Sequence, residues 1–179
     1  MILYFITGNV KKFTEAKMVL PSLEQLDMDL PEIQSLSPQE IISQKLQAAS
    51  EKFPDRQFIV EDTSLVFDAW NGLPGPLIKW YLISVGDTGI WQMIAWFANK
   101  KAQATCTIGY SDGDRIEFFE GITTGTIVEP TIDSDFGRDA LFQPDGYDKT
   151  FAHMTKEEKS SISHRGKALG LLQEFLLTL

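Results

Sequence analysis

The chain has 179 residues and a formal net charge of -9, with 43% apolar and 23% charged residues. These values are typical of a globular protein and exclude a disordered or fibrous chain. The acidic balance argues against a nucleic-acid-binding face, which needs clustered positive charge. The single cysteine, Cys106, excludes an internal disulfide and indicates a reducing compartment, so a cytoplasmic location is expected.

The N-terminal run MILYFITGN has no basic residue before it and no small-residue cleavage site, so it is predicted to be a strand and not a signal peptide. The most apolar later stretch, 77–98, is broken by charged residues and glycine and is not expected to span a membrane. No repeat, low-complexity tract or linker is present. We therefore expect one domain over residues 1–179.

The first part of the chain predicts a strand, a helix and a second helix. Residues 2–6 are a short apolar run typical of a buried strand. The polar turn Thr7-Gly8-Asn9 follows, and apolar spacing then predicts a helix that ends at Pro21. Ser37-Pro38-Gln39-Glu40 is a capping box with proline at the first helical position, and it begins a helix that runs to about Phe53.

A buried strand is predicted next, over 58–60, ending in Glu61-Asp62-Thr63. The segment 71–76 is rich in glycine and proline and predicts a rigid loop. A helix is predicted from Asp87 or Thr88 to Lys100. Tryptophans at helical intervals are expected in the core: Trp80, Trp91 and Trp96.

The second half predicts a long β-hairpin, with strands over 102–110 and 115–128 around a turn at 111–114. A structured loop over 136–147 with buried Phe142 and Tyr147 follows, then a second capping box at 155–158 and a last helix capped by Ser163. Strands and helices alternate before the hairpin enters. The fold class predicted from this order is α/β with a mixed sheet.

The turn after the first strand is a candidate anion site. A helix N-terminus presents unpaired N–H groups and the positive end of the helix dipole, which favour an anion. Lys11 and Lys12 lie in the first helical turn, where the dipole disfavours cations unless a phosphate arrives to neutralise them. The alternative is an ordinary strand-to-helix turn with solvated lysines.

The carboxylates Glu32, Glu61 and Asp62 are a candidate cation site. Ligands bind at the carboxyl ends of strands in α/β sheets, and neighbouring strand residues point to opposite faces, so only one of Glu61 and Asp62 should face a given site. Two carboxylates from separate segments would repel without a cation, and magnesium takes one or two carboxylates together with phosphate oxygens. The alternative is that these groups cap helices or pair with lysines.

Lys159, His164 and Arg165 form a third group, which offers hydrogen-bond donors and only a neutral imidazole nitrogen as an acceptor. Such donors suit a carbonyl or a phosphate, and the alternative is a solvated helix start. The aromatic, glycine and aspartate residues of 135–147 could stack on a flat ring and contact its edge. Cys106 is expected to be a small buried hydrophobe, and His153 is expected on the surface.

In this order the fragments resemble the inosine triphosphate pyrophosphatase family over nearly the whole chain. The matching segments are Thr7-Gly8-Asn9-Val10-Lys11-Lys12, Leu30-Pro31-Glu32-Ile33-Gln34, Val60-Glu61-Asp62-Thr63-Ser64-Leu65, Gly72-Leu73-Pro74-Gly75-Pro76, Phe136-Gly137, Phe142-Gln143-Pro144-Asp145-Gly146-Tyr147, and Ser163-His164-Arg165 with Ala168-Leu169. The resemblance implies an elongated, two-lobed α/β fold around a central mixed sheet with a long hairpin, a cleft between the lobes, and a homodimer. It also implies magnesium-dependent hydrolysis of noncanonical purine nucleoside triphosphates (ITP, dITP, XTP) to the monophosphate and pyrophosphate.

The resemblance also implies roles for particular residues. Lys12 corresponds to the chief cation of the triphosphate loop, Glu32 and Asp62 to the magnesium ligands, and Asp62 also to the general base. The implied substrate contacts are Thr7, Gly8, Asn9, Val10, Lys11, Lys12, Lys45, Asp62, Thr63, Lys79, Phe136, Gly137, Arg138, Asp139, Lys159, His164 and Arg165.

One stretch departs from the family pattern. The family usually has an aromatic residue after Phe-Gly and a proline after the aspartate, where this chain has Arg138 and Ala140. An arginine can stack on a base or turn toward phosphate. Relaxed or shifted base specificity is therefore one alternative, and a nucleotide-binding regulatory module without catalysis is another.

Overall fold

A long antiparallel hairpin forms the middle of the sheet in the computed structural model, which describes residues 2–132 and 138–179. Its strands β5 (Lys101–Ser111) and β6 (Ile116–Ile127) pair along their whole length, and β5 also pairs antiparallel with β3 (Gln57–Phe67). On the other side of β3, β1 (Leu3–Ile6) runs parallel to it. The hairpin and the first strand are confirmed.

Short strands complete the sheet. β2 (Glu24–Leu26) is parallel to β1, β4 (Pro74–Gly75) pairs with β3, and β7 (Phe142–Pro144) pairs with β6. The resulting order is β2-β1-β3-β5-β6-β7, with parallel and antiparallel neighbours. The predicted mixed α/β fold is confirmed.

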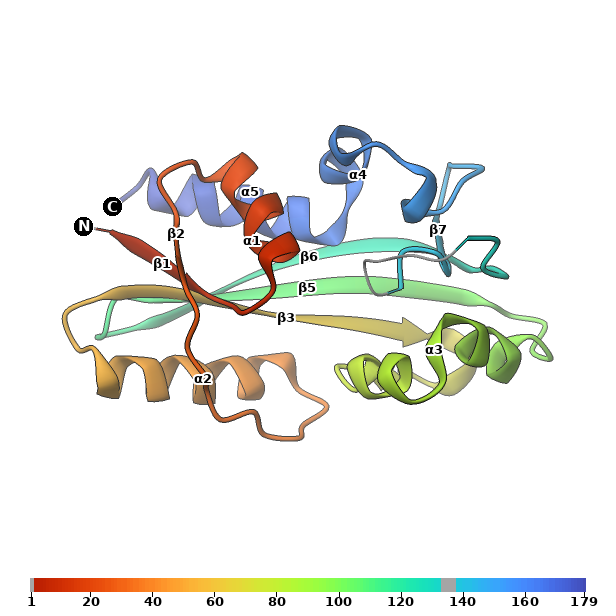
Figure 1. Cartoon of the computed structure of the whole chain (residues 1–179), viewed down its shortest axis with the longest axis horizontal. Helices are drawn as coiled ribbons and strands as arrows, with labels where there is room; N and C mark the ends of the chain where they lie inside the picture. Colours follow the sequence, from red (N-terminus) through yellow and green to blue (C-terminus); the bar gives the residue numbers. More distant parts are fainter. Residues whose placement is uncertain (1, 133–137) are drawn as a thin grey trace.

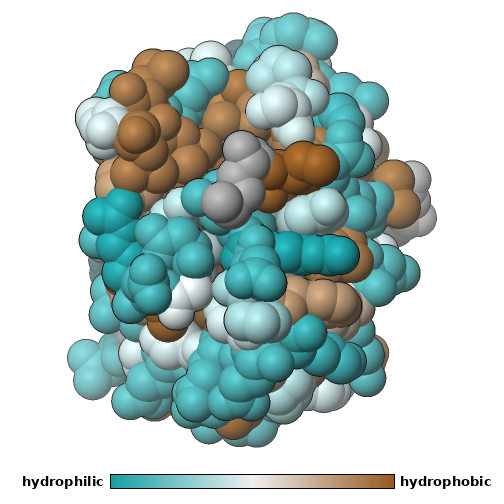
Figure 2. Space-filling model, turned by 90° about the vertical axis from the view of Figure 1, so that its left-hand side faces the viewer, coloured by the Kyte–Doolittle hydropathy of each residue, from teal (hydrophilic) through white to brown (hydrophobic). Residues whose placement is uncertain are grey.

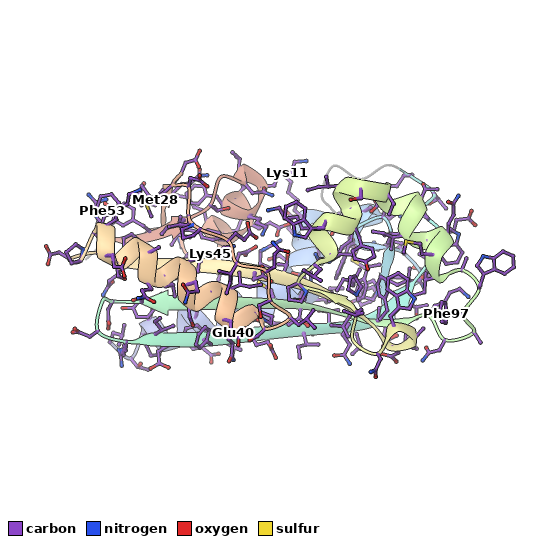
Figure 3. The ribbon with its side chains drawn as sticks, turned by 90° about the horizontal axis from the view of Figure 1, so that it is seen from below. Lys11, Met28, Glu40, Lys45, Phe53 and Phe97 are labelled. Carbon is purple, nitrogen blue, oxygen red and sulfur yellow. The ribbon has the colours of Figure 1, made fainter. Side chains whose placement is uncertain are left out.

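Helices cover both faces of this elongated sheet (Figure 1). One face carries α1 (Val10–Val19), α4 (Lys156–Ile162) and α5 (His164–Leu176). The other carries α2 (Pro38–Lys52) and α3 (Ile78–Ile94), which lie end to end beneath the sheet, with Phe53 at one end and Phe97 near the other (Figure 3). Two 3-10 turns, η1 (Asp68–Trp70) and η2 (Phe151–His153), lie in the connections.

Side-chain caps fix where these helices begin. Asn9 caps α1, and Ser163 caps α5 by accepting a hydrogen bond from the Gly166 amide. The capping box at Thr155 and Glu158 is complete. At α2 the Ser37 side chain caps as predicted, but the Glu40 carboxylate accepts its hydrogen bond from the Ser35 hydroxyl.

The alternation along β3 decides which side of the sheet each carboxylate faces. Phe58 and Val60 pack in the core cluster under α2, whereas Ile59 packs in the cluster under α5. Since side chains alternate along a strand, Glu61 faces the α5 side and Asp62 faces the α2 side. The two neighbouring acids therefore point to different faces of the sheet, as predicted, but both line the cavity described below, so the expectation that only one of them faces a given site is wrong.

Two predicted boundaries are wrong. β3 does not end at Glu61-Asp62-Thr63 but continues to Phe67, because ten of its residues pair with β5. The helix expected from Asp87 to Lys100 begins at Ile78 and ends at Ile94, with a break at Gly86, where φ is 65°. Only glycine adopts that conformation at little cost, so the chain bends there and continues as a second helical segment.

Several burial predictions are tested by the structure. Phe142 and Cys106 are fully buried and His153 is exposed, as expected. Trp80 and Trp96 were expected in the core, but they are 46% and 93% exposed because they lie on the outer side of α3 and beyond its end. Tyr147 is also exposed, since the chain turns outward after β7.

The molecular surface is mixed in character. The end that carries both termini is largely hydrophilic, with its larger hydrophobic areas in the upper half (Figure 2). In the part of the chain that the structure describes, no helix is long and apolar enough to cross a membrane.

Candidate active site

A cavity of about 540 Å³ opens where β1 ends beside the middle of β3. Its walls come from the loop after β1, the first turns of α1 and α3, the middle of β3 and the start of α5. β1 stops at Ile6 while β3 continues, so the short parallel strand leaves room above its carboxyl end. Ligands bind at such positions in α/β sheets.

The loop between β1 and α1 presents polar groups to this cavity. The Asn9 side-chain oxygen accepts hydrogen bonds from the amides of Lys11 and Lys12, at 3.0 and 3.2 Å. This cap therefore occupies two of the backbone N–H groups at the start of α1 that were predicted to bind an anion. It also fixes the carboxamide oxygen, so the Asn9 NH2 group is the part of that side chain left to donate to a ligand.

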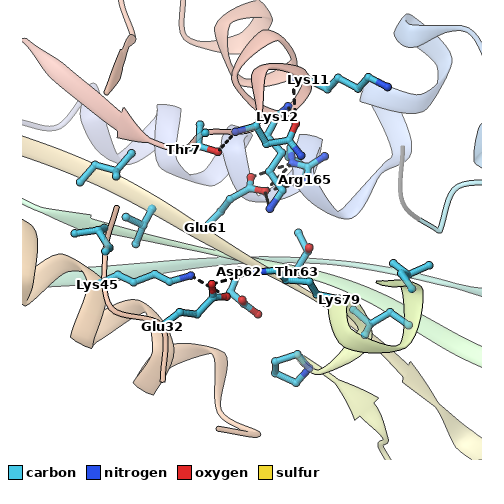
Figure 4. A pocket seen from close by; sticks show the side chains of 18 of the residues that line it. Thr7, Lys11, Lys12, Glu32, Lys45, Glu61, Asp62, Thr63, Lys79 and Arg165 are labelled. Carbon is cyan, nitrogen blue, oxygen red and sulfur yellow. Dashed lines mark hydrogen bonds and ion pairs between the residues drawn. The ribbon is translucent and has the colours of Figure 1, made fainter. Parts of the chain in front are cut away.

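A buried ion-pair cluster lies on the α5 side of β3 and is centred on Glu61. The Glu61 carboxylate accepts bidentate hydrogen bonds from Arg165 at 2.9 Å and lies 3.0 Å from the Lys12 ammonium (Figure 4). Burial alone would raise the pKa of Glu61, but Arg165 and Lys12 together hold that pKa well below its ordinary value. Glu61 is therefore a carboxylate that positions two cations of the cavity wall.

Glu15 extends the cluster to α4. Its carboxylate accepts hydrogen bonds from both Arg165 and Lys159, and Lys159 also donates to Asp139 at 2.6 Å. The Arg165 guanidinium, although it lines the cavity, is thus held mainly by Glu61 and Glu15. Such charge-assisted pairs fix side-chain positions.

On the α2 side, Asp62 and Glu32 face the cavity with Lys45 and Lys79 (Figure 4). Lys45 and Lys79 approach the Glu32 carboxylate at 3.4 and 3.1 Å. Burial of Glu32 would raise its pKa, but these two lysines lower it below the ordinary value.

Asp62 is in a different electrostatic state. Burial raises the pKa of Asp62 to about 6 although Lys45 and Lys12 lower it, and the neighbouring Glu32 and Glu61 add to the rise. Its Oδ2 atom is buried and has no hydrogen-bond partner within the described chain. A half-buried carboxylate with one buried, unpartnered oxygen and a pKa near neutrality is a candidate general base.

Arg138 and His164 form the wall opposite the lysines of α2 and α3. An arginine Nη atom lies 3.1 Å from Nε2 of His164. Because a guanidinium only donates, Nε2 is the acceptor and the neutral imidazole carries its proton on Nδ1. Burial, with Arg138 and Arg165 nearby, lowers the pKa of His164 well below its ordinary value.

The structure brings most of the predicted site residues together. The predicted residues that line the cavity are Thr7, Gly8, Asn9, Lys11, Lys12, Glu32, Lys45, Asp62, Thr63, Lys79, Arg138, Asp139, His164 and Arg165. Val10 lies outside the cavity wall, exposed on α1, and Lys159 lies behind Asp139. Phe136 and Gly137 lie outside the described residues.

Sequence reasoning missed two parts of the site. Ile78, Leu82 and Ile83 line the cavity from the first half of α3, a segment for which no helix was predicted. Glu15 was also missed, although its place three residues after Lys12 in a predicted helix puts the two on one face.

The arrangement is suited to a polyanion that carries a flat polar group. Lysines and the Asn9 loop surround one part of the cavity, two carboxylates face it beside them, and a donor-rich wall closes the other part. Among the described residues, no three or more acidic, histidine or cysteine side chains are grouped so that they could hold a metal ion by themselves. A divalent cation bound by Glu32 and Asp62 would therefore complete its coordination with ligand and water oxygens.

Comparison with known proteins gives consistent matches over the whole chain. The model of the Ham1 family matches residues 3–175. The chain is 45% identical to the inosine triphosphate pyrophosphatase of Schizosaccharomyces pombe, covering 96% of this chain and 93% of that protein. It is 41% identical to the protein of that name from Scheffersomyces stipitis, covering 97% of each. The solved Ham1 protein of Staphylococcus aureus superposes with a TM-score of 0.84, at 28% identity and 98% coverage of both chains.

Proposed function

Because this chain belongs to the Ham1 family, we propose that it hydrolyses noncanonical purine nucleoside triphosphates, such as ITP, dITP and XTP, to the monophosphate and pyrophosphate. The observation that carries this proposal is Asp62, a half-buried carboxylate whose buried Oδ2 atom has no partner within the described chain, inside a cavity rich in lysines. Relatives named inosine triphosphate pyrophosphatase at 40–45% identity support the substrate class.

In the proposed mechanism the chain's own groups bind, orient and deprotonate. Lys12, held by Glu61, and the Asn9 NH2 group bind the triphosphate beside α1. The Asp62 carboxylate accepts a proton from the water that attacks the α-phosphorus, through the oxygen that does not hold the cation, and pyrophosphate leaves as its bond to the α-phosphorus breaks. Lys45 and Lys79 turn from Glu32 to the phosphates and stabilise the charge that develops there.

The residues also fit a magnesium ion. The unpartnered Oδ2 of Asp62 and the carboxylate of Glu32 are hard oxygen donors facing the same cavity. We propose that these two residues hold Mg²⁺, which when bound would neutralise phosphate charge and orient the phosphates. A cation there would also relieve the repulsion by which Glu32 raises the pKa of Asp62.

The donor-rich wall explains why a purine with a carbonyl at position 6 would be accepted. Arg138 and His164 offer N–H groups and no carbonyl acceptor. The 6-amino group of adenine would place donor against donor and leave buried polar groups unpaired, at a cost of about 1–3 kcal/mol each. ATP should therefore be a poor substrate.

The test is pyrophosphate release from ITP, XTP, dITP, ATP and GTP with magnesium present. We expect release from the first three substrates, and Asp62→Asn should lower it by roughly 10²- to 10⁴-fold while nucleotide binding is retained. Asp55→Asn, at an exposed aspartate, is the matched control and should be fully active. Equal release from all five substrates would support the relaxed-specificity alternative, and binding without release would support the regulatory module.

We also propose that the protein is a cytoplasmic homodimer. Exposed apolar side chains on α3 and just beyond it, outside the cavity wall, support an interface there, namely Trp80, Met93 and Trp96. The buried Cys106, which forms no disulfide, supports a reducing compartment. Size-exclusion chromatography with light scattering measures the molar mass in solution and tests the dimer. Trp96→Glu should shift that mass toward one chain. A wild-type mass of one chain would contradict it.

A further inference from the structure

Arg138 is held in the cavity wall by neutral partners. One Nη atom donates to Nε2 of His164 at 3.1 Å, and the other lies 3.5 Å from the Thr63 hydroxyl. Its Nε atom is buried and has no hydrogen-bond partner. Arginine keeps its charge in proteins, so a positive charge is fixed at this position of the wall.

The carboxylates around Arg138 are engaged by other cations. Glu61 pairs with Lys12 and Arg165, and Asp139 pairs with Lys159 at 2.6 Å. Among residues 2–132 and 138–179, no carboxylate oxygen lies within 4.0 Å of the Arg138 guanidinium. The charge of Arg138 is therefore less compensated than those of its neighbours.

His164 adds a second unused donor beside Arg138. Its Nε2 atom accepts from Arg138, which leaves the proton on Nδ1. That Nδ1 atom is buried and lacks a partner within the described chain. A ligand that reaches this wall thus meets N–H donors and a positive charge that is less compensated than those of its neighbours, and unpaired buried donors favour a ligand that can accept.

We propose that Arg138 is a specificity-determining residue that makes this site prefer xanthine over hypoxanthine as the base of its nucleotide. This inference rests on the proposed function and deepens it. Xanthine carries carbonyls at positions 2 and 6, and in nucleotides its ring loses a proton near neutral pH because both carbonyls share the charge. Hypoxanthine has one carbonyl and stays neutral there. An anionic base pairs with the Arg138 charge, whereas a neutral base does not.

The rest of the cavity leaves the base as the group that Arg138 contacts. Lys12, Lys45 and Lys79 already supply cations near the Asn9 loop and the two carboxylates. Arg138 instead contacts Thr63 and His164, the first residue of α5, on the α5 side of β3. Lys45 and Lys79 lie with Glu32 on the α2 side, and Lys12 is held by Glu61. A phosphate-binding arginine would be expected among the lysines.

The test measures binding of the monophosphates XMP and IMP by calorimetry at neutral pH, so that it does not depend on hydrolysis. Wild type should bind XMP at least about tenfold more tightly than IMP. Arg138→Met should weaken XMP about tenfold and IMP less than about threefold, whereas Arg138→Lys, which keeps the charge, should retain most of the preference. Lys52→Met, an exposed cation outside the cavity wall, is the matched control and should change neither.

Other outcomes would overturn the inference. Equal wild-type affinity for XMP and IMP contradicts it, and so does Arg138→Met weakening both to the same degree. If Arg138→Met weakens binding of pyrophosphate as much as that of XMP, Arg138 binds phosphate and the proposal is wrong. Circular dichroism of each variant checks that the fold is intact. The proposed function fails separately, by absence of pyrophosphate release from every triphosphate.

Discussion

Replacing Glu61 by glutamine should destabilise the protein more than any exposed glutamate substitution. The change removes a buried negative charge that accepts the bidentate hydrogen bonds of Arg165 and pairs with Lys12. Removing one partner of a buried ion pair costs about 3–5 kcal/mol, because the other charge stays buried. The Lys12 side chain is 24% exposed and can turn toward water, and Arg165 retains its hydrogen bond to the Glu15 carboxylate. The lower end, about 3 kcal/mol, is therefore expected.

Thermal and chemical unfolding would measure this effect. A loss of about 3 kcal/mol corresponds to a fall in melting temperature of roughly 6–12 °C for a chain of this size. The pH dependence has a definite sign. Because the pKa of Glu61 is lowered in the folded protein, its stabilisation is present above the ordinary value of 4.5 and is lost as the pH falls below it. The difference between wild type and Glu61→Gln should shrink in acid.

Glu120→Gln is the matched control, since Glu120 is exposed on β6. It should change stability by less than about 0.5 kcal/mol. Combining Glu61→Gln with Arg165→Met should cost less than the sum of the two single changes, because the pair is removed together. A loss below about 1 kcal/mol for Glu61→Gln, equal at pH 7 and in acid, would refute this account of the cluster.

Three further predictions concern Asp62, the contact between β6 and α5, and the cation. Asp62 must be deprotonated and its pKa without a cation is about 6, so at limiting magnesium kcat/KM should rise with pH to about 6 and then level off. Since a bound cation lowers that pKa, the rise should move to lower pH as magnesium is increased, and a rate independent of pH from 5 to 8 at limiting magnesium would contradict its role. The same raised pKa means that stability from this group falls as pH rises from its ordinary value of 3.8 toward 6, so Asp62→Asn should melt higher than wild type at neutral pH. A Cβ at Gly121 would lie 2.0 Å from the His164 carbonyl, so Gly121→Ala should cost about 1–3 kcal/mol and displace the start of α5, whereas Gly170→Ala, with open space in the same helix, should be neutral or stabilising in urea unfolding. Chelation with EDTA should abolish pyrophosphate release, and Glu32→Gln should raise the magnesium concentration needed for half-maximal rate; an unchanged requirement would exclude Glu32 as a ligand.

Local signals in the sequence were enough for the elements that depend on neighbours in the chain. The caps at Ser37, Thr155 and Ser163 are formed by side chains within three residues of the amides that they accept from, so spacing alone predicts them. The Asn9 cap is equally local but was not predicted. The hairpin at 111–114 is also local, because its strands adjoin one turn. The order of the motifs along the chain was enough to indicate the family and the substrate class.

The predictions that failed depend on contacts between distant segments. β3 runs past Asp62 because β5 pairs with it over ten residues, and no pattern within residues 61–67 shows that partner. α3 begins at Ile78 because Ile78 packs against the sheet core with Ile90 and Ile94, while glycine at 86 hides the continuity of the helix. Trp96 is exposed because α3 ends at Ile94, two residues before it.

The sequence by itself determined the chemistry of this protein: which charged and polar residues it carries, the caps that begin its helices, and the fold class that their order indicates. Only the tertiary structure decided which of those charged groups form buried ion pairs and which face the cavity with a free oxygen. It buries Glu61 between Arg165 and Lys12, and it leaves Asp62, the next residue, on the opposite face with an unused oxygen. The physical reason is that strand alternation sends the two acids to different faces, and the pKa of each is set by burial and by cations that come from other parts of the chain.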